Sequence, residues 1–164
     1  MKIRPFEHAD AGAVAALHIE SWRDAYRGLL SEDYLGKGMV EDLDRQWKEA
    51  RPGTRDVVLL AESDEVVGFI AVWCRPDPFI ENLHVRPGAR SGGVGKTLMA
   101  TAARRLVSLG HSSAHLWVFE ANSRALSFYE RLGGVRSARE VKTVHGNSLA
   151  SVKVVWDDLT VLAG

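Results

Sequence analysis

The sequence predicts an α/β fold, in which about four helices pack on the faces of a mixed β-sheet of about seven strands. Two apolar runs within residues 56–76 flank Ser63–Asp64–Glu65, a pattern typical of an antiparallel hairpin. From Phe79 onwards the order becomes strand, helix, strand and helix, which is typical of an α/β unit. No internal repeat, linker or low-complexity tract divides the chain, so we expect one domain over residues 1–164.

The N-terminal segment, residues 1–50, predicts a short strand followed by two helices. The strand covers Lys2 to Phe6, Asp10 has the position of a helix N-cap, and Gly28 ends the first helix. Ser31 begins a second, more polar helix that extends towards Ala50. The buried face of the first helix is marked at helical spacing by Val14, Leu17, His18, Ala25 and Tyr26.

The remaining elements lie between clusters of glycine, proline and asparagine, which favour turns. In chain order we expect a strand at Phe79–Val85, a helix at Val94–Leu109, a strand at Ala114–Phe119, a helix at Asn122–Leu132 and two strands on either side of His145–Gly146–Asn147. Both helices are amphipathic, so each one is expected to bury one face against the sheet.

The composition is that of an ordinary globular protein. Lys plus Arg and Asp plus Glu both number 21, so no net charge favours nucleic acid or an anionic membrane. The single Cys74 cannot form an internal disulfide, which fits a reducing compartment. The segment MKIRPFEHAD carries charge where a signal peptide needs an apolar run, and no apolar stretch approaches the ~20 residues of a membrane span. We therefore expect a cytoplasmic location.

The most informative segment joins the strand that ends at Val85 to the helix that begins near Val94. Its glycines let a phosphate approach the backbone without a Cβ in the way. Backbone N–H groups at the start of a helix are free to donate, and the helix dipole favours an anion there. The segment therefore predicts a phosphate or pyrophosphate site without indicating which molecule carries the phosphate.

A nucleoside triphosphate is one ligand for such a loop, because Gly92–Gly93–Val94–Gly95–Lys96–Thr97 is similar to a P-loop. The spacing G-x-x-x-x-G-K-[ST] would need glycine at position 90, where this chain has Arg90. A P-loop also normally follows the first strand of its domain, whereas this loop lies beyond mid-chain. A P-loop ATPase is therefore kept as an alternative.

Coenzyme A is the other ligand. The run Arg90–Ser91–Gly92–Gly93–Val94–Gly95 matches [QR]-x-x-G-x-[GA], the pyrophosphate loop of GNAT acetyltransferases. The preceding strand, with its exit Val85–Arg86–Pro87, resembles the strand and the usual V-x-P exit of that family, and Leu98–Met99 resembles its helix.

A second block, LWVFEANSRALSFYERLGG at residues 116–134, resembles the later strand and helix of the same family. Asn122, Ala125, Phe128–Tyr129 and Leu132–Gly133 stand in the family's usual order. Residues 16–35 resemble the first helices of many bacterial GNAT proteins, so the resemblance covers nearly the whole chain. It implies the GNAT fold, a mixed sheet whose strands splay apart at the cofactor cleft.

The resemblance implies acetyl-CoA as cosubstrate and no metal. In GNAT enzymes the pantetheine arm pairs with the strand before the loop, and the pyrophosphate meets the loop's N–H groups, with a basic side chain such as Arg90 or Lys96 adding charge. The cofactor-binding residues that it implies are Leu83, His84, Val85, Arg90, Ser91, Gly92, Gly93, Val94, Gly95, Lys96, Asn122 and Tyr129.

The resemblance also implies direct attack of a neutral amine on the thioester. Tyr129 has the place of the family's general acid, which protonates the departing thiolate, and a backbone N–H near Val85 is expected to stabilise the oxyanion. The alternative for Tyr129 is a packed core tyrosine, because Phe128 and Tyr129 lie in an amphipathic helix.

A base is needed because a primary amine with a pKa near ~10 is mostly protonated at neutral pH. Glu81 is our candidate, since strand alternation puts Phe79, Glu81, Leu83 and Val85 on one side, where several family members carry their base. The alternative is a half-exposed glutamate or a structural ion pair. His84 would face the other way, packed or solvated, and Glu120 is a weaker candidate.

The acceptor pocket is expected to involve Trp22 and Tyr26, which lie at i and i+4 on one face of the first helix. They would line the pocket or belong to the core. The expected acceptor is the primary amine of a small molecule or of a peptide, although Trp117 stands where ribosomal-protein acetyltransferases often carry glutamate. A homodimer is expected by analogy with relatives. The functional alternative within the fold is a catalytically silent acyl-CoA sensor.

Overall fold

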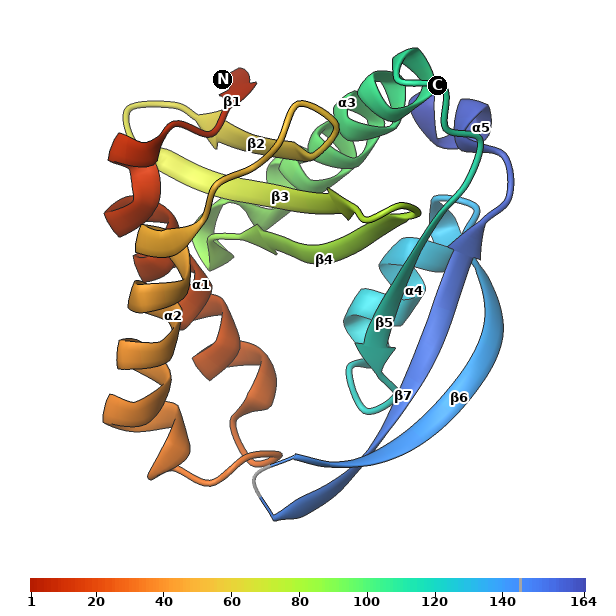
Figure 1. The fold of residues 1–164 in the computed structure, drawn as a ribbon. Coiled ribbons are helices and arrows are strands. Elements are labelled where there is room, and N and C mark those ends of the chain that lie inside the picture. Colours follow the sequence, from red (N-terminus) through yellow and green to blue (C-terminus); the bar gives the residue numbers. More distant parts are fainter. Residues whose placement is uncertain (145) are drawn as a thin grey trace.

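A mixed sheet of seven strands, in the order β1-β2-β3-β4-β5-β7-β6, runs through the molecule (Figure 1). The computed structural model describes residues 1–144 and 146–164, so His145 of the predicted turn lies outside the described residues. The strands are β1 (Lys2–Pro5), β2 (Val57–Glu62), β3 (Val66–Cys74), β4 (Pro78–Val85), β5 (Ala114–Phe119), β6 (Val135–Val144) and β7 (Asn147–Trp156). This arrangement confirms the predicted fold class.

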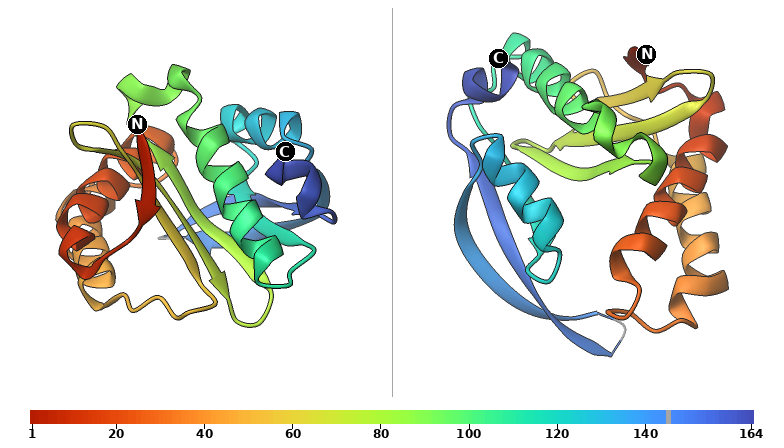
Figure 2. Two further views of the ribbon diagram at one scale, coloured as in Figure 1. Left: turned by 90° about the horizontal axis from the view of Figure 1, so that it is seen from above. Right: turned by 180° about the vertical axis from the view of Figure 1, so that it is seen from behind.

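Helices cover both faces of the sheet, as Figure 2 shows from above and from behind. They are α1 (Ala11–Tyr26), α2 (Met39–Glu49), α3 (Val94–Ser108), α4 (Ser123–Arg131) and α5 (Leu159–Ala163). The α1 and α2 helices pack on one face of β2–β4, and α3 packs on the other, next to α5. None of the helices in the described part of the chain has the length and apolar character to cross a membrane.

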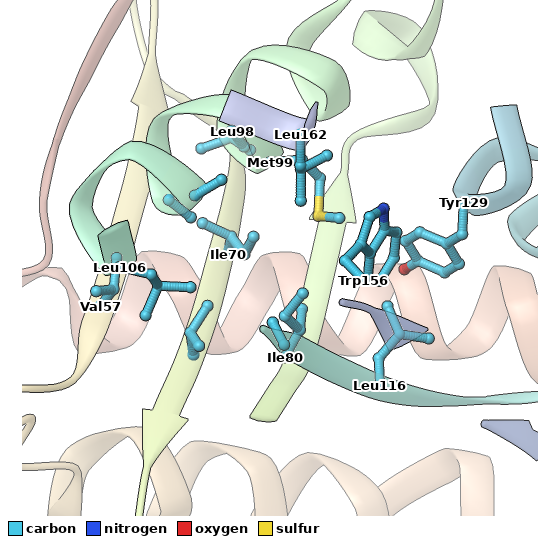
Figure 3. Packing of buried hydrophobic residues seen from close by; sticks show 14 of the residues in the cluster. Val57, Ile70, Ile80, Leu98, Met99, Leu106, Leu116, Tyr129, Trp156 and Leu162 are labelled. Carbon is cyan, nitrogen blue, oxygen red and sulfur yellow. The ribbon is translucent and has the colours of Figure 1, made fainter. Parts of the chain in front are cut away.

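The β2–β3 hairpin is buried on both faces, which explains its two nearly continuous apolar runs. On one face Val57 and Ile70 pack against Leu98 and Leu106 of α3, in the larger core cluster that Figure 3 shows. On the other face β2 and β3 pack against α1 and against Trp47 of α2. The hairpin is therefore the layer that holds α1–α2 and α3 at fixed positions on either side of the sheet.

The sheet opens between β4 and β5, which are parallel neighbours. Among the described residues these strands pair at one register position, Phe79 with His115, and they then diverge (Figure 1). The backbone of β4 beyond that point therefore keeps its hydrogen bonds to β3 on one side and lacks a strand partner on the side of β5.

A β-bulge in β4 corrects the predicted alternation of its side chains. Asn82 lies opposite Ala71 and Ile80 lies opposite Val72, so Glu81 is an extra residue without a cross-strand partner. The prediction that Phe79, Glu81, Leu83 and Val85 share one side was therefore wrong, because the alternation resets at the bulge. Phe79 pairs with Trp73 on the α1–α2 face, whereas Leu83 and Val85 pack on the α3 side.

Other differences have local causes. The second helix begins at Met39 rather than at Ser31, because an irregular turn at Tyr34–Gly38 contains Gly36 in a non-helical conformation. The Asp10 carboxylate accepts hydrogen bonds from Arg4 and from the N–H of Glu7, and it makes no cap bond to α1. The α5 helix was not predicted, since five residues are too few to show periodicity.

Gly134 provides a test of the packing between α4 and β7. A Cβ at this position would lie 2.5 Å from a Val154 methyl carbon and 2.9 Å from the Trp156 ring. We expect Gly134→Ala to lower the free energy of unfolding by about 1–3 kcal/mol, measured by urea denaturation. Gly12→Ala is the matched control, because nothing lies within 4 Å of its Cβ; it should raise stability by about 0.5 kcal/mol. Equal effects of the two variants would contradict this account.

Candidate active site

A cleft of about 660 Å³ lies where β4 and β5 diverge. The α1 and α2 helices form one wall, and the loop before α3 together with α4 forms the opposite wall. The predicted site residues that line it are Trp22, Tyr26, Glu81, Leu83, His84, Val85, Arg90, Gly93, Gly95, Lys96, Asn122 and Tyr129. Ser91, Gly92 and Val94 were also predicted for the site but are not among the lining residues, and the Val94 side chain is buried in the core.

The loop before α3 has the features of an anion site. A 3-10 turn at Pro87–Gly92 leads into Gly93, whose φ of 75° is left-handed and therefore favours glycine. The first main-chain bond of α3 runs from the N–H of Thr97 to the carbonyl of Gly93, which leaves the earlier N–H groups of the helix without helical partners. Gly95 packs closely against α4, because a Cβ there would lie 3.2 Å from the Phe128 ring.

Arg90 ties this loop to the end of β4 and to α1. Its Nε donates to the carbonyl of Val85 at 3.1 Å, and its Nη1 donates to the Asp24 carboxylate at 2.7 Å. Arg124 of α4 reaches the same carboxylate at 3.4 Å. Much of the Arg90 charge is thus shared with Asp24, whereas no ion pair engages Lys96 among the described residues.

Tyr129 of α4 is both a core residue and a wall of the cleft. Only 9% of it is exposed, and its ring lies edge-on to Trp156 with centroids 5.9 Å apart (Figure 3). Its burial, with a smaller effect of Tyr26, raises the pKa of the hydroxyl above the ordinary value, so it stays protonated at neutral pH. Within residues 1–144 and 146–164 nothing hydrogen-bonds this hydroxyl. The two predicted interpretations of Tyr129 are therefore compatible.

Glu81 and Glu120 are both exposed side chains, but only Glu81 lines the cleft. Partial desolvation at the cleft wall raises the pKa of Glu81, although a hydrogen bond from the Trp73 side chain and the charge of Arg75 oppose this rise. Glu120 is an exposed partner of Arg139, with an N–O distance of 2.7 Å, and it does not line the cleft.

A polar cluster lies on the α1 side of the cleft. The Trp47 indole N–H donates to Nδ1 of His18 at 3.0 Å, and the Ser21 hydroxyl hydrogen-bonds Nδ1 of His84. The two imidazole rings are 4.8 Å apart. Burial lowers the pKa of His18 to about 4 and that of His84 well below its ordinary value, so both rings are neutral at neutral pH. The His84 side chain is therefore packed into the cleft wall, one of the two predicted outcomes.

Three polar residues that line the α1 side of the cleft were not predicted for the site: His18, Ser21 and Asn82. For His18 the sequence alone indicates only a position on the buried face of the first helix. A signal was present, because Asn82 is a polar residue inside an otherwise apolar strand and is only 8% exposed. Ser21 follows His18 by three residues and so shares its helix face.

Trp22 and Tyr26 line the cleft and also pack against neighbouring rings. The Tyr26 ring lies 5.0 Å from that of Trp22 and 4.9 Å from that of Phe119, so it spans from α1 to β5. Burial raises the pKa of Tyr26 to about 12. Asn122 lines the cleft while its side-chain oxygen caps α4 by accepting from the N–H of Ala125 at 3.2 Å. In the described part of the chain no group of three metal-ligating side chains could hold a metal ion.

Comparison with known proteins identifies the family. Residues 18–134, more than half of the 164-residue chain, match the model of the Acetyltransferase (GNAT) family. The chain therefore belongs to the GNAT family of acetyltransferases, as its motifs predicted. This assignment decides against the P-loop ATPase.

Individual relatives agree with the family match. The chain is 26% identical to the uncharacterized N-acetyltransferase YuaI of Bacillus subtilis, over 98% of this chain and 95% of the relative. It is 32% identical to an uncharacterized N-acetyltransferase of Archaeoglobus fulgidus, over 79% of this chain and 89% of the relative. The fold is similar to that of the PaiA N-acetyltransferase from Thermoplasma acidophilum in complex with coenzyme A, with a TM-score of 0.68, 22% identity and coverage of 93% and 96%.

The neutral His18 makes stability depend on pH. Its folded-state pKa of about 4 lies below the ordinary value of 6.5, so the unfolded chain binds more protons between these pH values. The free energy of unfolding is therefore highest above pH 6.5, and it falls by about 3 kcal/mol as the pH is lowered towards 4. His18→Gln should flatten this part of the profile, measured by urea denaturation at several pH values. An unchanged slope in the variant would contradict the assignment.

Proposed function

We propose that the protein transfers an acetyl group from acetyl-CoA to the primary amine of a small acceptor, by direct attack in a ternary complex. The observation that carries the proposal is the meeting of three features in one cleft: the open edge of β4, the free N–H groups at the start of α3 and the unpartnered hydroxyl of Tyr129. Membership of the GNAT family supports the same activity.

The residues present fit coenzyme A. The N–H groups of Val94, Gly95 and Lys96 lack helical acceptors and suit a pyrophosphate, and the nearby Lys96 ammonium adds charge. The open edge of β4 along Leu83–Val85 suits an extended amide-bearing arm, which would pair with it like an added strand. Acetyl-CoA, when bound, supplies the activated acetyl thioester.

Tyr129 is proposed as the general acid. Its raised pKa keeps the hydroxyl protonated, so a proton is available for the sulfur that departs. Packing of the ring against Trp156 and Phe128 fixes the direction of the hydroxyl, which lowers the entropic cost of placing the proton.

Glu81 is proposed as the general base. An ordinary glutamate is a weak base towards an ammonium group, and the desolvation that raises the pKa of Glu81 improves the match. The bulge supports this role, because Glu81 is the extra residue of β4 and its side chain lines the cleft.

The acceptor side supports a small amine. The contact between Tyr26 and Phe119 narrows the cleft between α1 and β5, and Leu149 of β7 packs on the cluster formed by Leu30, Leu35, Met39 and Leu43. Trp22 and Tyr26 would contact an apolar part of the acceptor.

We infer a cytoplasmic location from the free Cys74, because a free thiol fits a reducing compartment. The homodimer stays a prediction.

Ligand-dependent stability tests the proposal. A ligand present at about 100 times its Kd should add about 2.7 kcal/mol of stability, so acetyl-CoA and CoA should each raise the Tm, and ATP–Mg²⁺ should not. Release of free CoA with a panel of primary amines then tests for turnover. A rise in Tm with ATP alone would contradict the proposal. Binding of acetyl-CoA without turnover of any amine would favour the alternative function, a catalytically silent acyl-CoA sensor.

Removal of the Tyr129 hydroxyl should slow the chemical step. We expect Tyr129→Phe to lower kcat by about 10²–10⁴, because the phenyl ring keeps the packing and only the proton donor is lost. The Kd of acetyl-CoA, measured by calorimetry, should stay within about threefold of the unsubstituted protein. A variant with full kcat would show that Tyr129 is only a packed core residue.

Replacement of Glu81 should change the pH profile. A base works only when it is deprotonated, so kcat/KM should rise with pH through the raised pKa of Glu81. Glu81→Gln should lower kcat/KM by about 10²–10⁴ and abolish its rise with pH. Glu120→Gln is the matched control, since it changes an exposed ion pair outside the cleft. If both variants keep the profile of the unsubstituted protein, Glu81 is not the base.

A further inference from the structure

Among the residues that the structure describes, two buried hydrogen-bond donors on the α1 side of the cleft have no acceptor. They are Nδ2 of Asn82, a residue that is 8% exposed, and Nε2 of His18, a residue that is 2% exposed. Both residues line the cleft. A buried polar group without a partner costs free energy, so an unsatisfied pair at one wall of a binding cleft points to a ligand that supplies the acceptor.

The hydrogen-bonding state of His18 follows from its neighbour. The indole N–H of Trp47 can only donate, so Nδ1 of His18, 3.0 Å away, must be the acceptor. A neutral imidazole that accepts at Nδ1 carries its hydrogen at Nε2. This nitrogen is therefore a donor. The rings around it, those of Trp22, Phe69 and His84, supply no oxygen that could accept.

The two donors belong to residues on the surfaces where β4 and α1 face each other. Asn82 and His84 are two residues apart after the bulge, so both face α1, and the His84 ring lies against that of His18. Nδ1 of His84 is already engaged by Ser21. Asn82 directly follows Glu81, the proposed base, and both residues line the cleft, which suits an acceptor whose oxygen lies a few bonds from its nitrogen.

We propose that Asn82 and His18 bind a carbonyl or carboxylate oxygen of the acceptor, which is therefore an amine with that oxygen on the neighbouring carbon: an amino acid, its amide or a peptide N-terminus. The inference rests on the proposed acetyltransferase function. A carbonyl oxygen fits two donors because it accepts twice and donates nothing, whereas an alcohol would bring a hydrogen of its own. Polyamines and simple alkylamines offer no oxygen and would leave both donors unsatisfied.

Matched pairs of amines test this specificity. We would measure kcat/KM for phenylalanine amide against phenethylamine and for leucine amide against isopentylamine, with free phenylalanine and leucine as further arms. The ratio of amide to plain amine is compared between the unsubstituted protein and two variants of similar size, Asn82→Leu and Asn82→Asp. The intrinsic basicity of each amine cancels in this comparison. Asn82 is varied because replacement of His18 would also remove the acceptor of the Trp47 indole.

We expect both Asn82 variants to lower the ratio by about tenfold, which is the usual effect of one lost hydrogen bond to a substrate. Asn82→Asp should lower it at least as much as Asn82→Leu, because a carboxylate repels a carbonyl oxygen. The Tm and the Kd of acetyl-CoA show whether each variant is folded, and the preference of the unsubstituted protein for the amides is a test that needs no variant. The free amino acids distinguish a carboxylate from a neutral carbonyl as the bound group.

Two results would overturn the inference while the acetyltransferase function stands. One is a ratio that is the same in the unsubstituted protein and both folded variants. The other is acetylation of plain amines or polyamines with no acetylation of any carbonyl-bearing compound. If acetyl-CoA raises the Tm but no amine of any class is acetylated, the proposed function fails together with the inference.

Discussion

The loss of pairing between β4 and β5 is the constraint on which the rest of the structure depends. A sheet that opens in its middle gives up backbone hydrogen bonds, and its exposed groups must be satisfied by water or by a ligand. The opening persists because other contacts join the two halves. The larger core cluster extends behind the opening from β2–β4 to β5 and β7, and the Tyr26–Phe119 contact joins α1 to β5 in front of it. The cleft is thus bounded by packed side chains on both sides.

This arrangement explains why the elements contribute different chemistry. The start of α3 offers unpaired N–H groups, which suit a polyanion, while α1 and β4 offer neutral donors and neutral imidazoles, which suit an uncharged or zwitterionic molecule. Asp24 of α1 binds the guanidinium groups of both Arg90 and Arg124, so the positive charge of these two side chains is partly neutralised near the loop before α3. One cleft can therefore hold two chemically unlike molecules without mixing their sites.

Most of the fold, including the glycine-rich loop before α3, could be predicted from the sequence, because glycines and strand exits are local signals. Gly93 and Gly95 were identified by spacing, and the structure gives each a geometric reason. The bulge at Glu81 could not be predicted, since it depends on the register of β4 against β3, a non-local property. The acceptor side was less predictable for the same reason. His18 and Asn82 are distant in sequence and look like core positions until α1 is packed on β4. The roles of the site residues stay predictions.

The bulge also bears on how the protein can change over time. A residue in a regular strand is held by a partner on the neighbouring strand, so its replacement disturbs the sheet. Glu81 has no residue opposite it in the β3–β4 register, although the Trp73 side chain donates to it, and it lines the cleft. Substitutions of Glu81 should therefore cost less stability than substitutions of its neighbours Ile80 and Asn82, which are buried. Within β4, Glu81 is therefore a position that tolerates substitution between two buried residues.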